Sequence, residues 1–170
     1  RDVFSRILLG TRVSLSIGIM AVIISTIIGV FFGVIGGYFG GRIDSIVVWL
    51  INIFWSIPTL LLVIAISLAI GKGFWQIYIA IGCSIWVEVA RLVRGKIKSE
   101  KEKDYIIAIK VLGISHYKII LNHILPNIIG PILIISATNF ASSILLESGL
   151  SFLGIGTQPP VPSWGYMIKE

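Results

Sequence analysis

The sequence predicts an all-α protein, a polytopic bundle of membrane-spanning helices, and three observations support that fold class. First, 56% of the 170 residues are hydrophobic and 13% are charged, whereas about a quarter of the residues in an ordinary globular domain are charged. Second, four apolar runs are long enough to cross a bilayer as helices. Third, eight of the fourteen basic residues lie in one segment between two of these runs, which is typical of a loop on one side of a membrane.

The four apolar runs define the predicted spans. A helix needs about 20 residues to cross the hydrocarbon core of a bilayer. Three runs are longer than that and carry no charge, and the fourth contains only Glu88. The predicted spans are residues 13–39, 45–70, 74–91 and 127–147.

The basic segment, residues 91–125, sets the expected orientation. Its eight Lys and Arg residues outnumber three acidic residues, and an excess of Lys and Arg marks the cytoplasmic side of a membrane protein. Four crossings then place both ends of the chain outside, with residues 148–170 as an outer loop. Arg1, Arg6 and Arg12 would then lie outside, which is an exception to this charge rule.

The net charge of +6 indicates membrane topology rather than a nucleic-acid-binding surface. We therefore expect membrane lipid and no nucleic acid among the partners. The single cysteine, Cys83, leaves no disulfide framework and no cluster of thiol ligands for a metal.

Small residues in the first span predict close helix contact. Gly29, Gly33 and Gly37 recur every four residues, and Gly41 continues the spacing. Such a face lets another helix backbone approach closely. In the second span, Pro58 is expected to kink the helix, either along a transport pathway or merely for helix packing.

The last span carries a polar stripe, which consists of Ser136, Asn139, Ser143 and Glu147. Facing lipid would be unfavourable for these side chains, so they are expected to face protein or water. They are the candidate residues of a translocation pathway. For Glu147, a position at the level of the lipid headgroups is the alternative.

The segment between the third and fourth spans predicts two short helices. Residues 105–112 form the first, with Asp104 as the cap and Gly113 as the end. Residues 115–125 form the second, which Ser115 caps and Pro126 ends. These helices expose apolar side chains, which either an anionic lipid surface or a soluble partner protein would cover.

The order of several short motifs carries a resemblance to a known family. Ala108, Gly113 and Ile124-Leu125-Pro126 match the cytoplasmic loop of permease subunits of ABC-type importers, while Ile107 and Ile109 stand where that pattern has Glu and Ala. The flanking stretches "GGYFGGRID", "ARLVRG", "HILPN" and "ESGLSFLGIGTQPPVPSWGYMI" are similar to the second permease subunit of dipeptide, oligopeptide and nickel importers.

The resemblance implies a single type I ABC importer transmembrane domain over residues 1–170, in the cytoplasmic (inner) membrane. Terminal helices of the full subunit are expected outside this sequence. The expected partners are ATP-binding subunits, a second homologous permease in a heterodimer, and an extracytoplasmic solute-binding protein. The loop at residues 100–125 is expected to couple the permease to the ATPase. Its coupling residues would be Tyr105, Ala108, Leu112, Gly113, Ile124, Leu125 and Pro126.

Enzyme chemistry is not expected of this chain. It contains no GxxxxGK[ST], HExxH or GxSxG motif, so ATP hydrolysis would belong to a partner. His116 and His123 lie about 10 Å apart on an ideal helix, too far to share a metal ion. No cofactor and no metal site are expected. A passive channel or a membrane scaffold without an ATPase is the alternative function.

Overall fold

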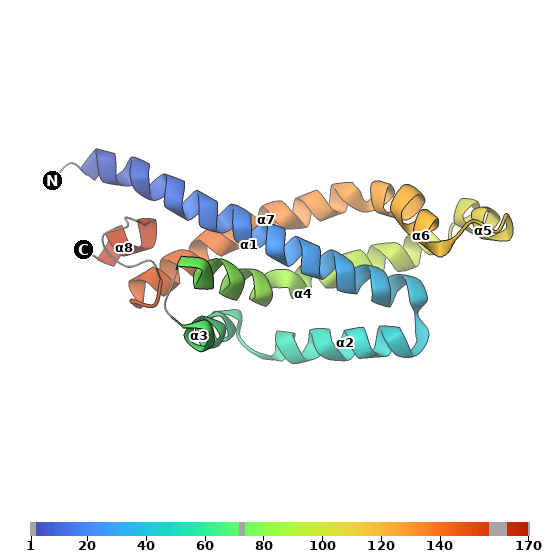
Figure 1. The fold of residues 1–170 in the computed structure, drawn as a ribbon, viewed down its shortest axis with the longest axis horizontal. Coiled ribbons are helices and arrows are strands. Elements are labelled where there is room, and N and C mark those ends of the chain that lie inside the picture. Colours follow the sequence, from blue (N-terminus) through green and yellow to red (C-terminus); the bar gives the residue numbers. More distant parts are fainter. Residues whose placement is uncertain (1–2, 72–73, 157–162, 170) are drawn as a thin grey trace. The chain divides into compact units, whose positions relative to one another are not determined.

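The computed structural model describes residues 3–71, 74–156 and 163–169. Every regular element in these ranges is helical, which confirms the predicted all-α class (Figure 1). The elements are α1 (Val3–Phe39), α2 (Gly41–Ser56), α3 (Thr59–Ile70), α4 (Phe74–Lys101), α5 (Asp104–Val111), α6 (His116–Ile119), the π-helical turn η1 (Ile120–Ile124), α7 (Leu125–Phe152) and α8 (Trp164–Lys169).

Three helical segments of the described chain are long and apolar enough to cross a membrane: Ile7–Phe39, Trp75–Lys101 and His116–Phe152. Helices α2 and α3 form a fourth candidate only if they are counted together as one broken span. The sequence predicts one kinked helix there, whereas α2 and α3 are separate helices. The reason is Pro58, whose ψ of 127° is extended and whose ring has no N–H to continue the helical ladder.

The contacts divide the chain into two compact units. Helices α1, α4 and α7 contribute to both. Unit 1 comprises Arg1–Ser25, Ile57–Ile85 and Ala137–Glu170, and unit 2 comprises Thr26–Ser56 and Trp86–Ser136.

The core of unit 1 lies where α1, α3, α4 and α7 meet. Ile17, Val63, Ile81 and Leu150 are fully buried there, one from each of the four helices. A side chain on Gly82 of α4 would collide with α1, because its Cβ would lie 2.7 Å from the Cβ of Ile24. Close helix contact in this unit therefore depends on glycine as well as on apolar burial.

In unit 2, the predicted glycine face of α1 lies directly against α4. A Cβ on Gly29, Gly33 or Gly37 would come within 2.8, 2.9 and 2.8 Å of backbone oxygens of α4, which belong to Trp86, Ala90 and Arg94. The two backbones thus approach at the same four-residue spacing on both helices. Gly41 is not part of this face: its φ is +54° and it is the first residue of α2.

The C-terminal part of the chain is more helical than the outer loop predicted for residues 148–170. Helix α7 continues to Phe152, and α8 covers Trp164–Lys169. The proline-rich residues 159–162 of the predicted loop lie outside the described residues.

Candidate functional site

The candidate site is the helical loop between α4 and α7, which belongs to unit 2. Helix α5 ends in a glycine turn, as the sequence predicts. The N–H of Gly113 donates to the carbonyl of Lys110 (3.0 Å), and the N–H of Ile114 donates to that of Ile109 (3.4 Å). These bonds form a Schellman motif, which needs a residue with positive φ, and the φ of Gly113 is +76°.

The start of α5 differs from the prediction. Asp104 is the first residue of the helix rather than its cap, and the side chain of the cap residue Lys103 makes no capping hydrogen bond. Ser115 does occupy the cap position of α6, but its hydroxyl makes no capping bond either. Both helix starts are therefore held by contacts other than side-chain caps.

Glu100, near the end of α4, supplies such contacts for α5. Its carboxylate accepts from Nζ of Lys103 (2.6 Å) and from the hydroxyl of Tyr105 (2.9 Å). The hydroxyl of Tyr105 in turn accepts from Nδ2 of Asn127 in α7 (2.7 Å). Burial, with the hydrogen bond to Glu100 second, raises the pKa of Tyr105. The hydrogen bond to Glu100 also raises the pKa of Lys103.

Pro126 does not end the second helix as predicted. Helices α6 and α7 and the π-helical turn between them form one continuous run, His116–Phe152. Pro126 lies in the first turn of α7, directly after the π-helical turn. A π turn changes the hydrogen-bond register, so the missing proline N–H is tolerated there.

The inner face of the loop is part of the core of unit 2. Ile106, Ile119 and Ile124 are fully buried in one cluster with Ile97 and Tyr38. Full burial of a large aliphatic side chain stabilises a fold by roughly 1.5–3 kcal/mol. Ile124, a predicted coupling residue, therefore supports the loop from inside, and Leu125 packs partly buried against the same cluster.

The outer face of α5 is apolar and open. Val111 is 82% exposed and Leu112 is 77% exposed, and Ile107 is also exposed. The predicted coupling residues Tyr105, Ala108, Gly113 and Pro126 are exposed as well. We call Ile107, Ala108, Val111 and Leu112 the outer face of α5. The sequence reasoning missed Ile107 and Val111, although their spacing of four residues is that of one helix face.

The predicted pathway residues face protein. Ser136 lies 3.1 Å from the hydroxyl of Thr26 within unit 2. Asn139, Ser143 and Glu147 are fully buried in unit 1. The carboxylate of Glu147 accepts from the hydroxyls of Ser14 (3.3 Å) and Ser151 (2.7 Å). Glu147 is thus surrounded by protein, while its level relative to the lipid headgroups stays a prediction.

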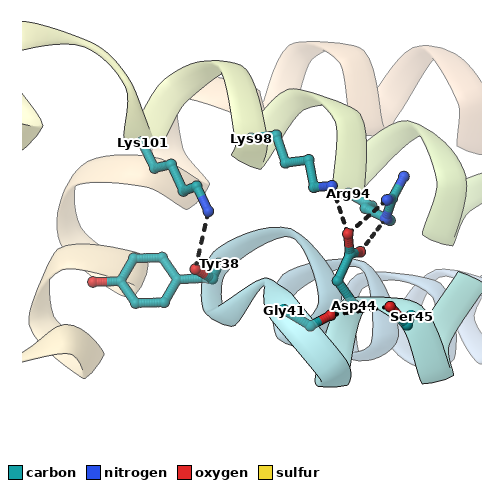
Figure 2. A network of polar contacts seen from close by, with 7 residues as sticks. All are labelled: Tyr38, Gly41, Asp44, Ser45, Arg94, Lys98 and Lys101. Atoms are coloured by element: carbon teal, nitrogen blue, oxygen red, sulfur yellow. Dashed lines mark hydrogen bonds and ion pairs between the residues drawn. The ribbon is translucent and has the colours of Figure 1, made fainter.

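A second polar cluster joins the ends of the helices in unit 2 (Figure 2). Asp44, in the first turn of α2, accepts from Nη2 of Arg94 (2.8 Å) and Nζ of Lys98 (2.5 Å) on α4. Nζ of Lys101 donates to the backbone carbonyl of Tyr38 at the end of α1 (3.4 Å). The ends of α1 and α4 and the start of α2 are therefore tied together where α4 leads into the loop.

Long apolar helices, with a compact helical loop between two of them, define a multi-span helical membrane protein. Over residues 29–170 the chain matches the family described as "Binding-protein-dependent transport system inner membrane component". The chain belongs to this family. The inner membrane location and the resemblance to ABC importer permeases are thereby confirmed.

Individual relatives agree with this assignment over all 170 residues. The chain is 45% identical to the oligopeptide transport system permease protein OppC of Salmonella typhimurium and 41% identical to the dipeptide transport system permease protein DppC of Bacillus subtilis. It is 37% identical to the glutathione transport system permease protein GsiD of Pectobacterium atrosepticum. The chain spans 53% to 56% of the length of these relatives.

Proposed function

We propose that this chain is the membrane-spanning part of a permease subunit of an ATP-driven importer, and that the outer face of α5 docks onto an ATP-hydrolysing partner subunit. The observation that carries the proposal is the exposure of Val111 and Leu112 on a loop whose opposite face belongs to the core of unit 2. Such a surface is held in place by the fold yet uncovered. An apolar helix face of this kind is suited to a groove in a partner protein.

The charges of α5 favour a protein partner over a lipid surface. Helices that lie on anionic membranes carry several Lys and Arg residues beside their apolar face. Helix α5 has one acidic residue, Asp104, and one basic residue, Lys110. The ammonium group of Lys110 lies 5.4 Å from the ring centroid of Tyr38 in the core of unit 2.

The substrate we propose is a dipeptide or an oligopeptide. Three of the relatives are named for transport of oligopeptides, dipeptides and glutathione, and these names support a peptide over a nickel complex. The proposed partners are two ATP-binding subunits, a second homologous permease and an extracytoplasmic solute-binding protein. The excess of basic residues in 91–125 supports a cytoplasmic position for the loop.

In the proposed mechanism, closure of the ATP-hydrolysing subunits moves the docked loop. The buried contacts of Ile106, Ile119 and Ile124 carry this movement to the parts of α1 and α4 in the same unit. Tightly packed helices shift as rigid elements, and such shifts alternate the access of a transport pathway.

The test places a charge on the outer face of α5 in the full-length permease. We expect Leu112→Asp to abolish co-purification with the ATP-hydrolysing subunit and to abolish uptake, because a buried unpaired carboxylate is strongly unfavourable at an interface. Ser99→Asp introduces the same charge at an exposed position of α4 outside this face and should leave both intact. Normal assembly and uptake with Leu112→Asp would support a passive channel or scaffold instead.

A further inference from the structure

Tyr38, next to the last residue of α1, contacts both helices of the loop. Its hydroxyl lies 2.7 Å from Nδ1 of His116, the first residue of α6. The phenol and imidazole rings meet edge to face, with 5.5 Å between their centroids. The ammonium group of Lys110 in α5 lies over the same phenol ring. One side chain of a membrane helix is therefore in contact with α5 and α6.

The backbone of Tyr38 is held by α4 (Figure 2). Its carbonyl accepts a hydrogen bond from Nζ of Lys101. Carbonyls in the last turn of a helix lack partners within the helix and favour a cation. The preceding residue, Gly37, lies so close to α4 that an added Cβ would be 2.8 Å from the carbonyl oxygen of Arg94. Tyr38 is thus positioned by α4 and not only by α1.

The other contacts of the loop with the membrane helices are of two kinds. Tyr105 at the start of α5 hydrogen-bonds to Glu100 of α4 and to Asn127 of α7, and the rest of the inner face of the loop is held by apolar packing. Ile106, Ile119 and Ile124 pack with Ile97 in the core of unit 2. Apolar contacts are non-directional, so they hold surfaces together without defining one register between them. A hydrogen bond is directional and weakens steeply when its angle changes. The contact between Tyr38 and His116 therefore adds a directional constraint between α6 and α1, whereas the hydrogen bonds of Tyr105 hold α5 against α4 and α7.

We propose that Tyr38 is a positioning residue for transport. Through His116 it fixes the register of the docking loop against α1 and α4, so that movement of the loop is passed to these helices without slipping. This proposal rests on the proposed function, because it requires a loop that a partner moves. The interaction is the same in either histidine tautomer: the phenol donates to a bare Nδ1, or a protonated Nδ1 donates to the phenol oxygen.

The test uses Tyr38→Phe in the full-length permease, assembled with its partners in proteoliposomes. The variant removes the hydroxyl but keeps the buried ring and the backbone carbonyl. We expect assembly and ATP hydrolysis to stay near wild-type levels. Transport per ATP hydrolysed should fall about fivefold, the factor that one neutral hydrogen bond of typical net strength contributes to an equilibrium.

Two further variants make the experiment specific. His116→Ala should reproduce the fall, and the double variant with Tyr38→Phe should lower the ratio no further, because both changes remove the same bond. Ser45→Ala is the matched control, since the hydrogen bond of its hydroxyl lies within α2, to the carbonyl of Gly41 (Figure 2). If Tyr38→Phe assembles poorly, transport per ATP hydrolysed is measured in His116→Ala instead.

The outcomes distinguish a failure of the role proposed for Tyr38 from a failure of docking through the outer face of α5. A wild-type ratio of transport to ATP hydrolysis in Tyr38→Phe or in His116→Ala overturns the role of Tyr38. Losses that multiply in the double variant also overturn it, because the two residues would then act separately. If Leu112→Asp still assembles and transports, the docking proposal fails, whatever the result for Tyr38.

Discussion

Asp44 and Arg94 form a two-pronged ion pair between the start of α2 and the last two turns of α4. The guanidinium group donates through Nε to Oδ1 and through Nη2 to Oδ2, and Nζ of Lys98 donates to Oδ2 as well. The Asp44 side chain is 13% exposed and that of Arg94 is 24% exposed. Such forked, charge-assisted bonds are both stronger and more specific in geometry than single neutral ones.

Replacing Asp44 with Asn should therefore destabilise the protein. The change leaves two cations in a partly buried position without their counter-charge, and we expect a loss of about 1–3 kcal/mol in the free energy of unfolding. Thermal unfolding of the purified full-length permease measures the loss. Ser45→Ala, one residue along the same helix, should not lower the melting temperature. An unchanged melting temperature in Asp44→Asn would show that the pair contributes nothing measurable.

The glycine face of α1 supports a second prediction. In Gly33→Ala the new Cβ would lie 2.7 Å from the Cβ of Val93 and 2.9 Å from the carbonyl oxygen of Ala90. Overpacking of this kind typically costs about 1–3 kcal/mol. The matched control is Gly95→Ala, because in the described part of the chain a Cβ added there meets nothing within 4 Å beyond the adjacent residues and backbone of its own helix. Alanine should be neutral or stabilising at that helical position, by up to about 1 kcal/mol.

The melting temperatures of Gly33→Ala and Gly95→Ala, measured by thermal unfolding, test this prediction. Equal stability of Gly33→Ala and Gly95→Ala would mean that α1 and α4 do not approach at Gly33 as closely as described. A further loss in Gly33→Val relative to Gly33→Ala is the expected trend, because the added methyl groups increase the overlap.

The glycine turn of the loop supports a third prediction. At Gly113 the φ of +76° is unfavourable for residues with a Cβ, by about 1–2 kcal/mol for alanine. Gly113→Ala should loosen the end of α5, and Gly113→Asn should do so less, because asparagine tolerates this conformation better. Hydrogen exchange at the amides of Gly113 and Ile114 reports the change. Exchange in Gly113→Asn that is faster than in Gly113→Ala would contradict the prediction.

The contacts of Glu100 support a fourth prediction, on alkaline pH. The carboxylate of Glu100 raises the pKa of Lys103 above its ordinary value of 10.5. A group whose pKa is raised in the folded state contributes stability at pH values below its ordinary pKa. This contribution is lost as the pH rises through the pKa that the group has in the folded state. The start of α5 should therefore become more sensitive to proteolysis above about pH 10.5.

Glu100→Gln provides the control for the alkaline experiment. The variant lacks the carboxylate that pairs with Lys103, so its sensitivity to proteolysis should be higher at neutral pH and should change less as the pH rises. The same alkaline change in wild type and in Glu100→Gln would show that another group is responsible.

Much of the fold could be predicted from local features of the sequence. Charge-free runs and the cluster of basic residues predict an all-α membrane protein, because solvation by lipid depends on composition over about 20 consecutive residues. The end of α5 at Gly113 was also predictable, since a positive φ selects glycine locally. The prolines were less informative: Pro58 separates two helices, whereas Pro126 lies inside a continuous helical run.

The composition and spacing of its residues determined that this protein is a membrane helix bundle with an apolar loop between two spans, because these properties need only neighbouring residues. Only the tertiary structure decided which face of the loop is open. Ile124 is buried while Val111 is exposed, although both are aliphatic. It also decided that Tyr38 meets His116 and that Asp44 meets Arg94. Contacts between residues so far apart in the chain depend on how the helices pack, and helix periodicity alone does not specify that arrangement.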